Sequence, residues 1–155
     1  MATHSDRGKA AETLVRAALK VLDAEDMNFT FNRIQDARAA HGMGQAQAGD
    51  FEAFRAGGGK TWNWIIEVKQ TEHERLLSYG NFKLDQVARM QVRDLAGSRA
   101  IVLVYHSTFK KWKLLPLEFF SKRDTSRGSW DLSLVPAGKL IALLKKEFYE
   151  TNCIK

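Results

Sequence analysis

The stretch DFEAFRAGGGKTWNWIIEVK, residues 50–69, predicts two strands joined by a tight turn. The first strand begins near Asp50 and is rich in apolar side chains. The glycine-rich run at 57–60 is a strong signal for chain reversal. The second strand spans 61–69, so we expect the two strands to pair as a hairpin.

The second strand ends on two charges. Side chains on a strand alternate between its faces, which separates a core-facing set from an opposite set. The two sets are Trp64, Ile66 and Val68 against Ile65, Glu67 and Lys69. Burying Glu67 and Lys69 is costly unless they pair or bind an ion. They form the only Glu/Asp-x-Lys triplet in the chain, and an isolated surface pair is the alternative interpretation.

Asp50 adds a second carboxylate at the same place. Hairpin pairing brings it beside Glu67, which gives two hard oxygen ligands for Mg²⁺ or Mn²⁺. Two adjacent carboxylates repel each other and favour a divalent cation between them. Such a cation polarises a phosphate and activates water, and a lysine such as Lys69 stabilises the developing negative charge. The trio predicts phosphodiester hydrolysis.

The rest of the chain predicts an α/β domain with a mixed sheet. The element order is α-β-β-β-α-β-β-α-α, with a polar loop at 35–49 and a polar connection at 72–83. The other predicted elements are helices at 6–24, 84–96, 117–122 and 138–151 and strands at 28–34, 100–105 and 111–115.

Four short motifs follow one another between Arg7 and Phe120. They are Arg7-Gly8 followed by Glu12, then Asp50-Phe51, then Glu67-Val68-Lys69-Gln70-Thr71, then Asn81-Phe82 followed by Gln86. In order and spacing they resemble the motifs of the PD-(D/E)xK nuclease superfamily and, within it, of the RecU-like Holliday junction resolvases. The resemblance implies a restriction-endonuclease-like fold, a mixed β-sheet flanked by helices, in a single nuclease domain over 1–155.

The resemblance also implies roles for the matching residues. Asp50 and Glu67 would bind Mg²⁺ or Mn²⁺, and Gln86 would add a side-chain carbonyl or hold a ligand water. Lys69 would stabilise the transition state, and Glu12 would be an outer ligand of the metal or of water. For Gln86 and Glu12 an ordinary position on a helix surface is the alternative.

The activity implied is symmetric nicking of branched DNA, a Holliday junction above all, by a homodimer. The chain departs from the RecU-like pattern at Ala48, where those proteins carry Thr, and in the loop 35–49, which is shorter and has only Arg38 as a reliable positive charge. A compact, phage-type resolvase would reconcile the RecU-like motifs with the short loop. The alternatives are a general or restriction-type nuclease of duplex DNA and, from another class, a non-catalytic DNA-binding module.

A net charge of +6 and a pI of about 9.5 favour a polyanionic partner. The predicted DNA contacts are Arg7, Lys9, Arg33, Thr71 and Lys83. Arg89 and Arg93 are also near the site in sequence, although they fit a solvated helix face equally well. We interpret a second basic cluster as a solvated strand edge and loop: Lys110, Lys111 and Lys113 around Trp112, then Lys122, Arg123 and Arg127.

Several classes of protein are disfavoured. One cysteine, Cys153, builds neither a disulfide framework nor a zinc cluster, and the four histidines lack metal-ligand spacing. No apolar run approaches the roughly 20 residues of a membrane span, and the N-terminus lacks the core of a signal peptide. Gly59-Lys60-Thr61 does not complete a phosphate-binding loop, because Phe54 replaces its first glycine and a strand follows. We expect a cytoplasmic protein of a bacterial or phage-infected cell, with no membrane partner and no nucleotide cofactor.

Overall fold

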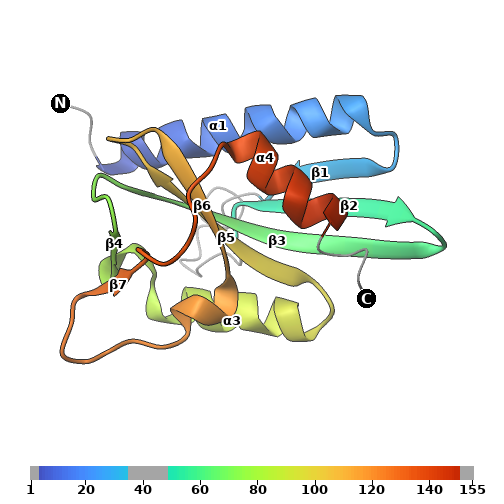
Figure 1. Cartoon of the computed structure of the whole chain (residues 1–155). Coiled ribbons are helices and arrows are strands. Elements are labelled where there is room, and N and C mark those ends of the chain that lie inside the picture. The colour runs from blue at the N-terminus through green and yellow to red at the C-terminus, as the bar shows by residue number, and fades with distance from the viewer. Residues whose placement is uncertain (1–3, 35–48, 151–155) are drawn as a thin grey trace.

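A five-stranded mixed sheet is the centre of the fold in the computed structural model, which describes residues 4–34 and 49–150 (Figure 1). The strand order is β1-β2-β3-β5-β6, with β3 parallel to β5 and every other pair antiparallel. These strands are β1 (Phe29–Arg33), β2 (Phe51–Gly57), β3 (Lys60–Thr71), β5 (Arg99–His106) and β6 (Lys111–Pro116). The α/β class and the mixed sheet expected from the sequence are confirmed.

The predicted hairpin is the pair β2–β3. Its turn is Gly58-Gly59, and both residues have positive φ, 59° and 74°. Positive φ at both central residues defines the type I′ turn, whose twist matches that of the flanking strands. The register pairs Phe51 with Ile66, which places Asp50 directly beside the end of β3 that carries Glu67.

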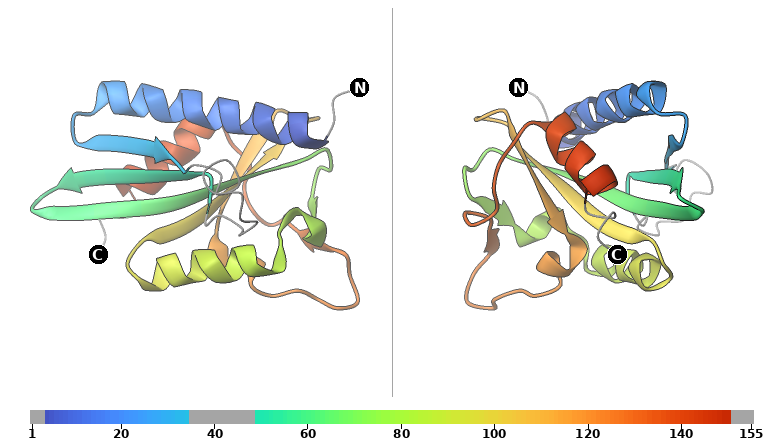
Figure 2. Two further views of the ribbon diagram at one scale, coloured as in Figure 1. Left: turned by 180° about the vertical axis from the view of Figure 1, so that it is seen from behind. Right: turned by 45° about the vertical axis from the view of Figure 1, so that its right-hand side comes forward.

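Helices cover both faces of the sheet (Figure 2). Helix α1 (His4–Glu25) and helix α4 (Leu140–Lys145), which continues as a π-helical turn at Lys146–Glu150, pack on one face. Helix α3 (Leu84–Leu95) and the 3₁₀ turn η2 (Leu117–Phe120) cover the other.

The alternation predicted for β3 is confirmed. The buried residues Trp64, Ile66 and Val68 join the apolar cluster on the α1 side of the sheet. Ile65 joins a second cluster on the opposite side, with Phe82 and others. By alternation along β3, Glu67 is on the same face as Ile65, the face that α3 covers.

Two parts of the sequence prediction were wrong. The connection 72–83 is not irregular throughout, because it contains β4 (Leu76–Ser78) and the 3₁₀ turn η1 (Tyr79–Asn81). Strand β4 pairs with β7 (Ser129–Asp131), which was not predicted, in a separate two-stranded sheet. The final helix is also shorter than predicted and changes to π geometry at Lys146. The predicted loop 35–49 lies outside the described residues except for Gly49.

Within the described ranges, none of the helices combines the length and apolarity that a membrane crossing requires.

Candidate active site

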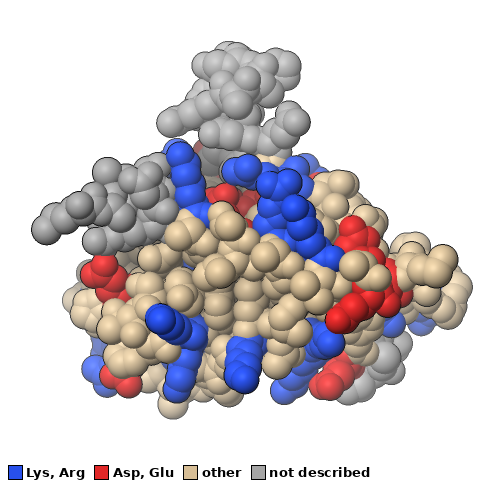
Figure 3. All heavy atoms as spheres, turned by 90° about the horizontal axis from the view of Figure 1, so that it is seen from above, with Lys and Arg blue, Asp and Glu red and all other residues tan. Residues whose placement is uncertain are grey.

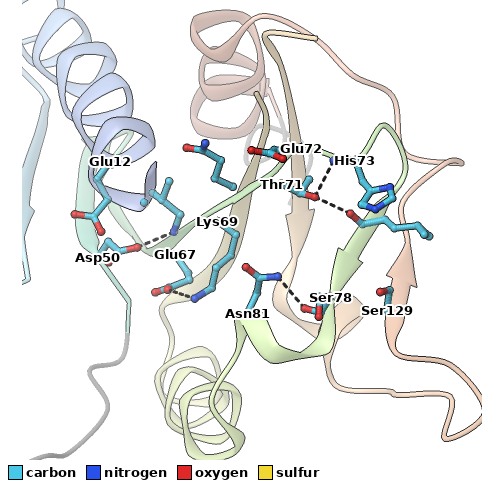
Figure 4. Close-up of a pocket in the computed structure, with 14 residues that line it drawn as sticks. Glu12, Asp50, Glu67, Lys69, Thr71, Glu72, His73, Ser78, Asn81 and Ser129 are labelled. Atoms are coloured by element: carbon cyan, nitrogen blue, oxygen red, sulfur yellow. Dashed lines mark hydrogen bonds and ion pairs between the residues drawn. The ribbon is translucent and has the colours of Figure 1, made fainter. Parts of the chain in front are cut away.

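A pocket of about 500 Å³ opens beside the C-terminal end of β3, the central strand of the sheet (Figure 4). Its walls come from the first turns of α1, the entry to β2, the last third of β3 and the small β4–β7 sheet. Glu12, Asp50, Glu67 and Lys69 line it together, although they come from three elements of the chain. Figure 4 shows these four side chains directed toward one another.

Backbone hydrogen bonds fix the position of Asp50. Its N–H donates to the carbonyl of Ile66 over 2.8 Å, and its own carbonyl accepts from the N–H of Ile34 over 2.9 Å. The carboxylate accepts from the N–H of Val68 over 2.8 Å, so β3 holds the side chain as well. Asp50 is therefore fixed by both neighbouring strands before any ligand binds.

Gly49 makes this close approach possible. Its φ is +109°, a conformation that L side chains rarely adopt. A Cβ built at this position would lie 2.6 Å from Cγ2 of Ile65 and 3.3 Å from the carbonyl oxygen of Ile66. Only glycine lets the chain enter β2 this close to β3, so Gly49 sets the position of Asp50.

Glu67 and Lys69 form a buried ion pair. The ammonium Nζ lies 2.9 Å from Oε1 of Glu67 and donates to the side-chain oxygen of Gln86 over 3.4 Å. It also lies 4.6 Å from the centroid of the Phe82 ring, within the range of a cation–π interaction. Oε2 of Glu67 is buried and has no hydrogen-bond partner among the described residues. An unpartnered buried carboxylate oxygen beside a polar pocket is what an open ligand position requires.

The two buried carboxylates bind protons unusually tightly. Burial, then the charges of Glu67 and Glu12, raise the pKa of Asp50 to about 8, although the Val68 N–H and Lys69 oppose the rise. Burial also raises the pKa of Glu67, and Glu12 adds to this rise, whereas Lys69 and Gln86 lower it. Desolvation and like charges therefore act against two ionised carboxylates here, and a divalent cation is the partner that reverses this effect.

The donor set fits Mg²⁺ or Mn²⁺. Both ions prefer oxygen ligands and commonly use one or two carboxylates, with water and substrate oxygens completing the shell. Asp50 and Glu67 supply the carboxylates, and none of the described residues forms a hydrogen bond with Oε2 of Glu67. Across the described residues, no group of three or more His, Cys, Asp or Glu side chains is placed to hold a metal by itself.

Glu12 connects this pocket to a second, basic hollow of about 250 Å³. Lys9, Arg16 and Arg33 line that hollow, and Nη2 of Arg33 lies 3.4 Å from Oε2 of Glu12. On the face drawn in Figure 3, Lys and Arg atoms surround a small group of acidic atoms at one margin. Arg16, which the sequence analysis did not select, could have been found from its position one helical turn after Glu12.

The other predicted residues lie around the pocket or away from it. Thr71 lines the pocket, where its hydroxyl donates to the carbonyl of Leu76 and accepts from the N–H of His73. Gln86 is buried behind Lys69 and is not part of the pocket wall. Lys83 is exposed at the start of α3. The side chain of Arg7 lies outside the described residues.

Arg89 and Arg93 form surface ion pairs with Asp85 and Glu52, at 3.6 and 3.7 Å. Solvent-exposed pairs of this kind contribute little to stability and leave the guanidinium groups accessible. Neither arginine lines the pocket.

The far wall of the pocket was not predicted. Ser78, Asn81 and Ser129 line it from β4, η1 and β7, and Asn81 donates to the carbonyl of Ser78 over 3.0 Å. The Asn81-Phe82 motif was the available signal for Asn81. Ser78 and Ser129 pair across the small sheet although 51 positions separate them, so no local pattern indicates them.

Comparison with known proteins identifies the fold. No family model matches the sequence, and no curated protein matches it either. Among solved structures, the chain is similar to the 1.6 Å resolution structure of Hjc from Archaeoglobus fulgidus, a Holliday junction resolvase from an archaeal hyperthermophile. The match has a TM-score of 0.55 and 18% sequence identity, and it covers 88% of this chain and 94% of that chain. The chain therefore has the restriction-endonuclease-like fold, a mixed sheet flanked by helices.

Proposed function

We propose that this chain is a divalent-metal-dependent endonuclease that cuts DNA, and that its residues 1–155 act as one nuclease domain. The observation that carries the proposal is the convergence of Asp50, Glu67 and Lys69 on one polar pocket, where a buried oxygen of Glu67 has no partner within the described part of the chain. The basic hollow that adjoins the pocket through Glu12 supports a polyanionic substrate.

In this proposal each side chain has a defined task. Asp50 and Glu67 hold Mg²⁺ or Mn²⁺, and the bound ion supplies Lewis acidity and a more acidic water. Lys69 directs positive charge into the pocket, where it stabilises the additional negative charge on the phosphate oxygens in the transition state. Gln86 holds the Lys69 ammonium from behind, so we assign it a positioning role. Its direct metal ligation stays a prediction, as does an outer-ligand role for Glu12.

The substrate that we propose is branched DNA, with the Holliday junction first. Two findings support this: the order of the RecU-like motifs and the similarity in fold to a Holliday junction resolvase. Resolution requires two symmetric nicks, and a two-fold homodimer presents two equivalent sites to the junction. A homodimer is therefore part of the proposal.

The test is cleavage of a labelled four-way junction beside a linear duplex of the same sequence, with Mg²⁺ or Mn²⁺. We expect faster cutting of the junction, paired nicks and a dimer by light scattering. Asp50→Ala and Glu67→Ala should each abolish cutting and leave the circular dichroism spectrum unchanged. Arg89→Ala is a matched control, because Arg89 lies on the surface outside the pocket.

Other outcomes select the alternatives. Equal rates on junction and duplex indicate a general or restriction-type nuclease. Tight binding to the junction without product under any metal condition indicates a DNA-binding module. Undiminished cutting by either alanine variant contradicts the proposed active site.

A further inference from the structure

A second pocket lies on the other side of the turn that borders the active site. The tip of the β5–β6 hairpin is tied to the end of β3: the N–H and hydroxyl of Ser107 donate to the carbonyl of Thr71 over 3.0 and 3.3 Å. The hydroxyl of Thr108 donates to the carbonyl of Glu72 over 3.0 Å. Figures 1 and 2 show this tip beside the end of β3 and the first turns of α1.

This hairpin pocket has a volume of about 310 Å³, and both apolar and polar residues line it. The ring of Phe109 lines it at the hairpin tip, and Val135 and Pro136 contribute from the segment before α4. Phe109 is 47% exposed, so much of its ring surface is open to a ligand. Glu74 lines the hairpin pocket, whereas Glu72 and His73 line the active-site pocket, so a single turn separates the two.

A buried histidine, His106, is one of the polar residues that line the hairpin pocket. Nδ1 of His106 lies 2.7 Å from the carbonyl oxygen of His73, and because a carbonyl only accepts, Nδ1 carries the proton. Burial lowers the pKa of His106 and Lys113 acts in the same direction, whereas the hydrogen bond to His73 opposes them. In the neutral ring with the proton on Nδ1, Nε2 is an acceptor. Nε2 is buried and has no hydrogen-bond partner among the described residues.

Two lysines line the hairpin pocket, and Lys111 is the exposed one. The other is Lys113, whose buried ammonium donates to the carbonyl of Leu132 over 2.6 Å. Lys110, next to Phe109, has a φ of +51°, which is uncommon for a residue with a side chain and marks a constrained turn. Glu74 is the acidic residue of the pocket wall, where it can accept from an exocyclic amine of a base. The lysines favour a ligand that is anionic at one end.

We propose that the hairpin pocket binds one unpaired nucleotide of the DNA, with its base stacked on Phe109 and its phosphate at Lys111. An aromatic platform beside lysines is the usual chemistry of single-stranded nucleic-acid binding. The volume of the pocket, about 310 Å³, is in the range for one base rather than several. A base inside a duplex keeps both faces stacked and is not available to Phe109. The inference rests on the proposed nuclease function and adds a preference for DNA that is unpaired near the cut, as at a branch point.

The test uses a DNA fork with one unpaired 2-aminopurine at the branch, with EDTA present so that no strand is cut. Binding of the parent protein should change the fluorescence of the probe as the base stacks. Phe109→Ala should weaken binding to the fork about tenfold, within the range for loss of one stacked base. Its affinity for a fully paired duplex of the same sequence should stay within about twofold of the parent.

Two further variants are controls. Leu134→Ala removes another exposed apolar side chain of this region, one that is 97% exposed and does not line the hairpin pocket, and should change neither affinity. Phe109→Trp keeps an aromatic face and should retain binding to the fork. Since Phe109 is half exposed at a turn, Phe109→Ala should have the same midpoint temperature of thermal unfolding as the parent protein.

The outcomes separate this inference from the nuclease proposal. If Phe109→Ala binds the fork as tightly as the parent while the parent cuts DNA, the hairpin-pocket proposal is wrong and the nuclease stands. If Phe109→Ala loses the fork selectively but the parent cuts no DNA with any metal, the pocket stands and the nuclease fails. Equal weakening on fork and duplex assigns Phe109 to general DNA contact and overturns the single-nucleotide site. Absence of any DNA binding overturns both.

Discussion

Replacing the buried Asp50 carboxylic acid by its neutral isostere should make the metal-free protein more stable at alkaline pH. Asp50→Asn preserves the shape of the side chain and the oxygen that accepts from Val68 N–H. It removes the negative charge that burial, Glu67 and Glu12 oppose. The expected gain in the free energy of unfolding is therefore electrostatic, and it depends on pH.

The direction in which the stability changes with pH follows from the pKa of Asp50 in the folded and unfolded chain. The pKa of Asp50 is about 8 in the folded chain against 3.8 as its ordinary value, so folding takes up a proton between these values. The contribution of Asp50 to stability is complete below about pH 4 and is lost progressively as the pH rises to about 8. At roughly 1.4 kcal/mol per pH unit the shift sets an upper bound of about 6 kcal/mol. The pocket is open to water, which hydrates part of the charge, so we expect about 2 kcal/mol at pH 8.

The assay is urea and thermal unfolding in EDTA, followed by tryptophan fluorescence, at pH 5 and pH 8. Asn at position 50 should raise the midpoint temperature at pH 8 by about 6 °C, since 1 kcal/mol corresponds to 2–4 °C in a chain of this size. The gain should be clearly smaller at pH 5. Asp23→Asn, on the exposed surface of α1, is the matched control and should give the same small difference at both pH values.

Two results would refute this reasoning. One is an Asp50→Asn protein that is no more stable than the parent at pH 8, and the other is a gain of equal size at both pH values. Mg²⁺ supplies an independent measurement, because it should stabilise the parent at pH 8 and leave the Asn variant unaffected. That measurement does not depend on any cleavage activity.

Further predictions concern catalysis, DNA affinity and the backbone. Lys69→Met should slow cutting by roughly 100-fold or more in single-turnover assays, because it removes the charge that stabilises the transition state; a rate within threefold of the parent would contradict that role. Lys83→Ala should weaken binding to all DNA sequences alike and reduce the slope of log K against log[salt] by about one unit, whereas a changed sequence preference at unchanged affinity would argue against phosphate contact. Gly49→Ala should lower the stability by about 3 kcal/mol, measured by urea unfolding, because the added Cβ meets Ile65 and the φ of +109° is strained; Gly128→Ala, with open space around it, should be nearly neutral.

Local patterns in the sequence were sufficient to predict the hairpin and its charged end. A two-residue turn fixes the register of the strands on either side, and alternation along β3 then fixes which side chains share a face. The proximity of Asp50 to Glu67 and Lys69 follows from these two local rules. For the same reason the apolar run in β5 was recognisable, since a strand buried on both faces is continuously apolar.

The parts of the site that come from helices needed the tertiary structure. A helical pattern predicts which face of α1 is buried, but it does not predict that Glu12 lies next to the end of β3. Gln86 matched a motif for metal ligation, which stays a prediction, and only the packing of α3 shows that its oxygen accepts from the Lys69 ammonium. The direction of a side chain at the edge of a helix depends on how that helix docks, which is a sum of many long-range contacts.

The small β4–β7 sheet and the hairpin pocket were decided by the tertiary structure alone. Strands of three residues are too short to show a period, and Leu77 pairs with Trp130 across 53 positions of sequence. Lys113 was interpreted as part of a solvated strand edge, yet it is buried, as is His106, because the segments after β3 and β7 cover them. Short-range register in the sequence was enough to bring Asp50 beside Glu67 and Lys69. Burial of the polar groups depends instead on which distant segments exclude water, and no local pattern encodes that.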